Sequence, residues 1–204
     1  MTEQYFARQP STESRPVETD FEYRGHSLRF RTDSGVFSRG RVDEGSALLL
    51  EALPPLRGRV LDLGCGVGVI GVSCARAFPA EVTLSDVNRR ALGLAEENLA
   101  LNGVTGSVVE SDGFTALTGA YDAIITNPPI RAGKAVIYRL FAEARDHLTE
   151  DGALYLVIRR QQGADSAEKY LRTLFAEVRM LKQKKGYRVF SCTGKEASAD
   201  AVST

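Results

Sequence analysis

The sequence predicts an α/β protein with a Rossmann-like, doubly wound sheet of seven strands, mostly parallel. Three observations support this prediction. Runs rich in β-branched and aromatic residues alternate with helical patterns through most of the chain, which is typical of a parallel sheet covered by helices. A glycine-rich turn follows the first of these strands. Two β-rich runs flank Gly186 near the C-terminus, which predicts a hairpin and an antiparallel strand at that side of the sheet.

Each element is placed by its local pattern. A short N-terminal β-hairpin is expected over 21–32, with its strands meeting at Gly25 and His26. The first helix, 43–53, begins at the N-cap residue Asp43 and ends before Pro54. The other strands are expected at 59–64, 82–86, 106–111, 121–127, 153–160, 177–185 and 187–193, and the other helices at 68–78, 89–102, 134–148 and 164–175.

The chain is expected to form one domain. Residues 1–20 mix Ser, Thr, Pro and charged residues without apolar periodicity, so we expect a disordered lead, then a single domain over 21–194 and a flexible tail over 195–204. No apolar run approaches the roughly 20 residues of a membrane span, and the N-terminus lacks a signal-peptide pattern. We therefore expect a cytoplasmic protein without a membrane partner, as a monomer or small homo-oligomer.

Cysteine content and charge narrow the function classes. Three cysteines without a CxxC pair predict neither a disulfide framework nor a metal site. The formal net charge is zero, yet residues 159–195 carry ten Lys and Arg against three acids, a local balance of +7. Such a run is more often a solvated face than a nucleic-acid site, so it permits RNA binding without predicting it.

Ligands of an open parallel sheet bind beyond the carboxyl ends of its strands. The first strand runs into DLGCGVG, in which Gly64, Gly66 and Gly68 allow a tight turn and close approach of the backbone to a ligand. The second strand ends at Asp86, twenty-two residues after Gly64, where a carboxylate can bind both hydroxyls of a ribose. The same glycines also satisfy GxGxxG, so a NAD-dependent oxidoreductase stays open at this point.

Two further strand ends carry polar groups. The third strand ends in ESDGF, where an acid and an aromatic ring can hold an adenine by its amino group and its face. The fourth ends in Asn127-Pro128-Pro129. The two prolines stiffen the chain and hold Asn127 in an extended conformation, so its amide is presented at a fixed angle. The amide oxygen and the Pro128 carbonyl are then two acceptors that suit the N–H groups of a poorly nucleophilic amine or amide.

The motifs DLGCGVG, SDVN, ESDGF and NPPI, in this order, resemble those of class I S-adenosylmethionine-dependent methyltransferases that methylate amino groups. SGVFSRGRVDEGSALLL and NPPIRAGK resemble, more closely, the catalytic domain of the small-subunit ribosomal RNA guanine-N2 methyltransferases, a methyltransferase small domain. The likeness covers about residues 21–192. It implies S-adenosyl-L-methionine as cofactor, guanine N2 as methyl acceptor, and RNA, ribosomal or within a ribosomal subunit, as partner.

The resemblance also implies a role for each motif residue. Asn127, Pro128 and Pro129 would be catalytic, and Ile130, Arg131 and Lys134 would bind the substrate. The residues expected to bind the cofactor are Phe37, Asp62, Gly64, Cys65, Gly66, Gly68, Asp86, Val87, Asp112, Gly113, Phe114 and Asn127.

Two departures from the family pattern keep alternatives open. Ile130 stands where many amine methyltransferases carry an aromatic residue that stacks on a flipped base. The two-domain ribosomal enzymes also carry a degenerate N-terminal copy, where this chain shows a short lead. Protein glutamine N5 and adenine N6 therefore remain alternative acceptors. A protein of a different class, which binds the cofactor during ribosome assembly without catalysis, also remains open.

Overall fold

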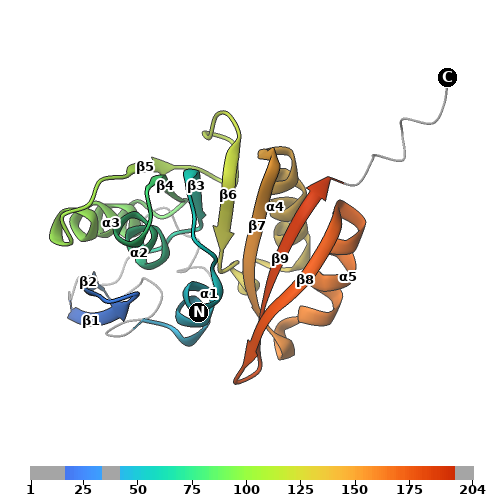
Figure 1. The fold of residues 1–204 in the computed structure, drawn as a ribbon, viewed down its shortest axis with the longest axis horizontal. Coiled ribbons are helices and arrows are strands. Elements are labelled where there is room, and N and C mark those ends of the chain that lie inside the picture. Colours follow the sequence, from blue (N-terminus) through green and yellow to red (C-terminus); the bar gives the residue numbers. More distant parts are fainter. Residues whose placement is uncertain (1–16, 34–41, 196–204) are drawn as a thin grey trace.

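The computed structural model describes residues 17–33 and 42–195. In this part of the chain a seven-stranded sheet runs through the molecule, with helices on both faces (Figure 1). The strand order is β5-β4-β3-β6-β7-β9-β8, in which the pairs from β5 to β7 are parallel and β9 is antiparallel to both of its neighbours. The predicted fold class is confirmed, including the antiparallel strand inserted near the C-terminal edge.

The elements follow the predicted alternation. The sheet consists of β3 (Gly58–Leu63), β4 (Ala80–Asp86), β5 (Ser107–Glu110), β6 (Tyr121–Thr126), β7 (Leu148–Arg159), β8 (Phe175–Lys184) and β9 (Tyr187–Lys195). The helices are α1 (Glu44–Ala52), α2 (Val69–Ala77), α3 (Arg89–Leu101), α4 (Lys134–Asp146) and α5 (Ala164–Leu174), with 3-10 turns η2 (Ile130–Ala132) and η3 (Arg160–Gln162). A separate antiparallel hairpin is formed by β1 (Val17–Tyr23) and β2 (His26–Thr32).

The sheet separates two hydrophobic cores. One core lies between the sheet and the pair α4 and α5, and the other between the sheet, helices α1 to α3 and the β1–β2 hairpin. Ile124 belongs to the first core and Ile125 to the second, and both are fully buried. Because successive side chains of a strand point to opposite faces, a central strand covered on both sides needs apolar residues at consecutive positions.

The main differences from the sequence prediction concern the N-terminal hairpin and the start of β7. The first strand begins at Val17, inside the lead that was expected to be disordered, because β1 pairs with β2 along its whole length. The turn of this hairpin is formed by Arg24 and Gly25, both with positive φ, and not by Gly25 and His26. This is the turn geometry that matches the twist of two paired strands. The strand expected at 153–160 begins earlier, at Leu148, which pairs with the first residue of β6.

The N-terminal hairpin is fastened to α3 by two asparagine side chains. Asn98 and Asn102 lie one helical turn apart. The side-chain amide of Asn98 accepts from the N–H of Arg31 and donates to its carbonyl, and Asn102 does the same with Arg29, over 2.7–3.0 Å. Their amides thereby satisfy backbone groups of β2 as a neighbouring strand would. Asn98 Nδ2 also donates to the Val67 carbonyl at 2.9 Å, which ties the hairpin to the glycine-rich turn after β3.

Candidate active site

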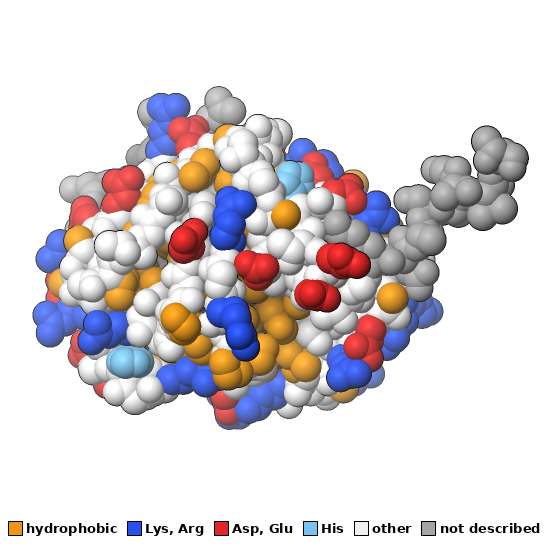
Figure 2. All heavy atoms as spheres, turned by 45° about the horizontal axis from the view of Figure 1, so that its top comes forward, with side chains coloured by type: hydrophobic (Ala, Val, Ile, Leu, Met, Phe, Trp, Pro, Cys, Tyr) orange, Lys and Arg blue, Asp and Glu red, His pale blue; other side chains and the backbone are white. Residues whose placement is uncertain are grey.

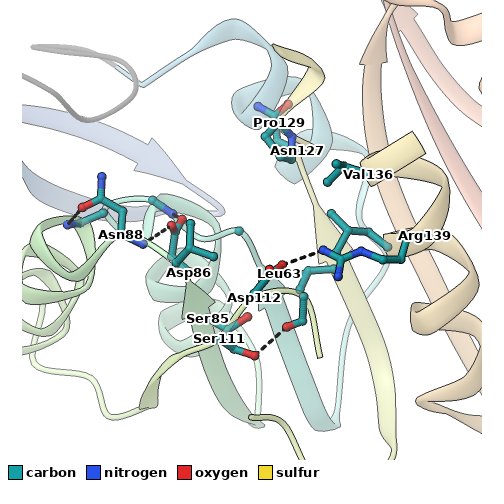
Figure 3. A pocket seen from close by; sticks show the side chains of 16 residues that line it. Leu63, Ser85, Asp86, Asn88, Ser111, Asp112, Asn127, Pro129, Val136 and Arg139 are labelled. Carbon is teal, nitrogen blue, oxygen red and sulfur yellow. Dashed lines mark hydrogen bonds and ion pairs between the residues drawn. The ribbon is translucent and has the colours of Figure 1, made fainter. Parts of the chain in front are cut away.

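A pocket opens at the carboxyl edge of the sheet (Figure 3). It lies where the strand order reverses between β3 and β6, and it is lined by the turns that follow β3, β4 and β6. Its empty volume, open mouth included, is about 810 Å³. The pocket is lined by Leu63, Gly64, Gly66, Ser85, Asp86, Val87, Asn88, Ala91, Ser111, Asp112, Gly113, Asn127, Pro129, Val136, Arg139 and Leu140.

The glycines of the turn after β3 serve two different purposes. Gly64 and Gly66 line the pocket, have φ values of 71° and 54°, and have no atom within 4 Å of the place where a Cβ would stand. They leave the backbone bare toward a ligand. Gly68 lies outside the pocket lining, and a Cβ there would come within 2.8 Å of Leu84 Cδ2. Its role is therefore the close packing of α2 against β4.

Asp86 joins the turns that follow β3 and β4. Its Oδ2 accepts from the N–H of Gly66 at 2.9 Å, and its Oδ1 accepts from the N–H of Asn88 at 2.9 Å. Burial raises the pKa of Asp86 above its usual value, and the backbone hydrogen bonds partly oppose this effect. The predicted ribose ligand Asp86 thus lies in the pocket, as does its neighbour Val87.

Asp62 supports the pocket from below and does not line it. Its carboxylate is almost fully buried, at 1% exposure, and accepts from the N–H of Gly71 in α2 at 2.7 Å. Burial raises the pKa of Asp62 from the usual 3.8 to about 7, and the nearby Asp86 charge contributes to the rise. Cys65 is also absent from the lining, and its N–H, like that of Gly64, donates to the Ser85 carbonyl.

The third strand end contributes unequally to the pocket. Asp112 and Gly113 line it, and Asp112 Oδ1 accepts from Arg139 Nη2 at 2.6 Å (Figure 3). Phe114, expected to frame an adenine, is buried and stacks on His147 with ring centroids 4.4 Å apart. The ring therefore packs inside the protein behind the pocket wall.

Asn127 stands at the corner between β6 and η2 and lines the pocket together with Pro129. Its Nδ2 donates to Oδ1 of Asp43, the N-cap residue of α1, at 3.0 Å and to Oγ of Ser46 in the first turn at 3.1 Å. The NH₂ end of the amide therefore points toward α1. The oxygen Oδ1, which is the acceptor of the amide, points away from α1. Pro128 is buried and is not part of the lining.

The residues predicted to bind substrate lie beyond this corner. Ile130 is half-buried and packs against the core beneath α4. Lys134, at the start of α4, is exposed, and its Nζ stands 5.1 Å from the centre of the Tyr138 ring. Phe37 and the side chain of Arg131 lie outside the described residues.

Half of the pocket wall was missed by the sequence prediction. The missed residues are Leu63, Ser85, Asn88, Ala91, Ser111, Val136, Arg139 and Leu140. Asn88 caps α3 by accepting from the N–H groups of Arg90 and Ala91, so a capping signal was present in the motif SDVN. Val136, Arg139 and Leu140 follow the spacing of one helix face, which sequence alone cannot assign to a pocket.

The basic segment 159–195 is partly neutralised by neighbouring acids. Lys182 pairs with Glu51 and Lys185 pairs with Glu44, both in α1. The face shown in Figure 2 likewise has basic and acidic side chains interspersed. Arg159 and Arg160 remain exposed at the end of β7, and Arg159 stands over the Tyr187 ring at 5.4 Å.

Among residues 17–33 and 42–195, no group of three or more His, Cys, Asp or Glu residues could hold a metal ion. No helix in the same part of the chain is long and apolar enough to cross a membrane. Burial raises the pKa of the Cys192 thiol to about 12 and also raises those of Cys65 and Cys74.

Known proteins resemble the chain over most of its length. The methyltransferase small domain family matches residues 27–191. The uncharacterized protein YbxB of Bacillus subtilis is 42% identical over 93% of this chain and 97% of its own length. Ribosomal RNA small subunit methyltransferase C of Vibrio cholerae is 41% identical over 67% of this chain, and the match spans 42% of that relative.

Solved structures agree with the fold. A T. thermophilus 16S rRNA N2 methyltransferase, in complex with AdoMet and guanosine, superposes with a TM-score of 0.79 at 29% identity, covering 90% of this chain and 51% of that one. A ribosomal protein L11 methylase from Lactobacillus delbrueckii superposes with a TM-score of 0.65 over 79% of this chain and 82% of that one. At 19% identity, the second likeness concerns the fold alone.

We predict that the buried carboxylate of Asp62 makes folding less favourable as pH rises. Since its pKa is higher in the folded than in the unfolded chain, the folded state holds the extra proton between about pH 4 and 7. The contribution of Asp62 to the free energy of unfolding is therefore largest below pH 4 and falls toward pH 7, by at most about 1.4 kcal/mol per pH unit. Asp62→Asn keeps an acceptor for Gly71 without this titration, so its advantage over wild type in urea unfolding should grow with pH. A difference independent of pH would contradict the assignment.

We predict that Asp86→Ala weakens binding of S-adenosyl-L-methionine at least tenfold, because lost charge-assisted bonds to a ribose typically cost over about 1.5 kcal/mol. Titration calorimetry measures the affinity. Asp146→Ala is the matched control, since this carboxylate is exposed at the far end of α4 and lies outside the pocket. Equal affinities of Asp86→Ala and wild type would remove Asp86 from the ribose site.

Proposed function

The chain belongs to the methyltransferase small domain family, and we propose that it transfers a methyl group from S-adenosyl-L-methionine to guanine N2 of ribosomal RNA. The observation that carries the proposal is the Asn127 amide, whose nitrogen is bound by α1 while the residue lines the pocket. The acceptor end of that amide is then available for a substrate N–H group. The remaining support comes from the fit of the cofactor and from the relatives.

The pocket residues fit the cofactor. Gly64 and Gly66 leave space that any side chain would fill, and the carboxylate of Asp86 suits a ribose. Leu63, Ala91 and Leu140 supply apolar walls. The carboxylate of Asp86, which lines the pocket, favours a cationic ligand electrostatically. S-adenosyl-L-methionine, when bound, supplies an electrophilic methyl group on a positively charged sulfonium.

The protein's contribution to the reaction is to position the acceptor nitrogen. The amide oxygen of Asn127 would accept one N–H bond of the exocyclic amine, and the carbonyl of Pro128, which lies between the lining residues Asn127 and Pro129, would accept the other. The nitrogen would then be held with its lone pair directed at the cofactor site. These acceptors also stabilise the positive charge that develops on the nitrogen, and its protons become acidic as that charge grows. No strong general base is needed in this scheme.

Exposed cations at the same edge of the sheet support RNA as the substrate. β7 runs parallel to β6, so Arg159 and Arg160 at its end lie on the side of Asn127. Lys134 begins α4 just after the corner. Such side chains suit phosphate contacts, which position a nucleic acid without reading its sequence. The ion pairs of Lys182 and Lys185 with α1 reduce the contribution of the hairpin β8–β9 to this surface.

The choice of guanine in ribosomal RNA rests on the named relatives. The T. thermophilus structure contains guanosine and AdoMet, and several curated relatives are named ribosomal RNA small subunit methyltransferase C. The chain spans about 42% of the length of the Vibrio cholerae relative. The acceptor nucleotide is therefore our proposal for this chain.

The decisive experiment uses S-adenosyl-L-methionine labelled in its methyl group. The protein is incubated with ribosomal subunits, or with naked ribosomal RNA, from cells that lack the gene, and the labelled product is identified after digestion. We expect label in N2-methylguanosine. Label in glutamine of a protein, in N6-methyladenosine, or nowhere in RNA would overturn the proposed acceptor.

We predict that Asn127→Ala slows methyl transfer by roughly 10²–10³-fold, the usual cost of removing a preorganised electrostatic partner, and leaves cofactor affinity nearly unchanged. Single-turnover rates and calorimetry separate the two quantities. Asn102→Ala is the matched control, because its amide holds β2 far from the pocket and its loss should not alter the rate. Equal losses of rate and affinity would place Asn127 chiefly on the cofactor.

A further inference from the structure

The first turn of α1 holds the amide that the proposed reaction uses. Asp43, 84 residues before Asn127 in the chain, accepts from its Nδ2 at 3.0 Å, and Ser46 accepts from the same nitrogen at 3.1 Å. The same Asp43 oxygen caps the helix by accepting from the Ser46 N–H at 2.9 Å. One carboxylate therefore begins α1 and anchors the catalytic corner.

The chemistry of this contact fixes which end of the amide faces α1. An ionised carboxylate can only accept hydrogen bonds, so the NH₂ end of Asn127 must point toward Asp43. The opposite orientation would place two oxygens against each other. With its nitrogen held in this way, Asn127 presents its oxygen on the other side, and the residue lines the pocket.

The packing around Gly45 confines the amide as well. A Cβ at Gly45 would lie 3.3 Å from Asn127 Nδ2, 3.1 Å from Asp43 Oδ1 and 3.1 Å from Tyr187 Cε1. The helix backbone at Gly45 thus lies close to the amide, and Tyr187 of β9 packs against the same glycine. Rotation of the amide is restricted by shape in addition to hydrogen bonding.

We propose that Asp43, assisted by Ser46, is a positioning residue for methyl transfer, which keeps the Asn127 amide from flipping. A flipped amide would turn its NH₂ group toward the N–H donors of the substrate, where neither partner could accept. Asp43 touches neither substrate nor cofactor in this scheme and acts through Asn127. The inference rests on the proposed function for its kinetic consequence, whereas the orientation of the amide can be measured without any activity.

The first test is Asp43→Ser, because serine is as good an N-cap as aspartate and its shorter side chain withdraws the acceptor from Asn127. We expect the transfer rate to fall roughly 10- to 100-fold, as for a misplaced reacting group, with unchanged cofactor affinity and an unchanged melting temperature. Glu51→Gln removes a negative charge from the last turn of the same helix, where it pairs with Lys182, and should leave the rate unchanged.

A double-mutant cycle separates positioning from a general structural effect. If Asp43 acts through Asn127, Asp43→Ser should change the rate less than twofold in an Asn127→Ala background, whereas independent effects would multiply. A full additional loss in that background would overturn the inference. So would a normal rate of Asp43→Ser in the otherwise wild-type chain.

The second readout is the NMR signal of the Asn127 side-chain amide, identified by its absence in Asn127→Ala. In wild type we expect both NH₂ protons to be protected from solvent exchange, and in Asp43→Ser we expect this protection to fall at least tenfold. Equal exchange in the two proteins would overturn the inference even if guanine is methylated. Conversely, if wild type methylates no guanine but shows the protected amide, the proposed function fails and the orientation by Asp43 stands.

Discussion

The carboxylate of Asp86 accepts backbone hydrogen bonds from Gly66 and Asn88, and these two contacts hold together the turns that follow β3 and β4. Both turns line the pocket, and the second begins α3. The arrangement has an electrostatic cost, because burial disfavours the charged form of the group. The turn geometry therefore depends on a carboxylate that a ligand with hydroxyl groups would further stabilise.

The carboxylate of Asp86 gives the pocket a negative group. Asp62 lies under the glycine-rich turn, and the nearby Asp86 charge helps to raise its pKa. Asp112 contributes a third acid at the rim, where it pairs with Arg139. A pocket with this distribution suits a cationic ligand, and an oxidoreductase cofactor with two phosphates would meet repulsion at the same place. The electrostatics and the family membership thus agree on a sulfonium cofactor.

In the proposed reaction, the acceptor side of the site works by geometry. The prolines that follow Asn127 stiffen its backbone, and α1 holds its side chain from the opposite direction. An amine with a delocalised lone pair gains more from being held at the right angle than from a base of high pKa. The N–H groups of the substrate amine must therefore meet hydrogen-bond acceptors. The contacts of Asn127 with Asp43 and Ser46 provide one, because they bind the NH₂ end of the amide and leave its oxygen as the acceptor.

Local sequence patterns were sufficient for the order of strands and helices along the chain, the tight turn at Gly64 and Gly66, the N-cap at Asp43 and the position of Asp86. These features depend on residues close together in the chain, whose spacing and backbone preferences can be read directly. The beginning of β1 at Val17 was missed because it is determined by pairing with β2, against a polar composition that suggested disorder.

Only the tertiary structure decided which distant groups meet. The spacing of Phe114 suggested a pocket wall, but packing against His147 places the ring inside the protein. Arg139 of α4 reaches Asp112 in the turn after β5, and Asn127 after β6 meets Asp43 at the start of α1. The two residues of each pair lie far apart in the sequence, and no repeating pattern connects them. Whether they meet is therefore decided by how the helices pack on the sheet.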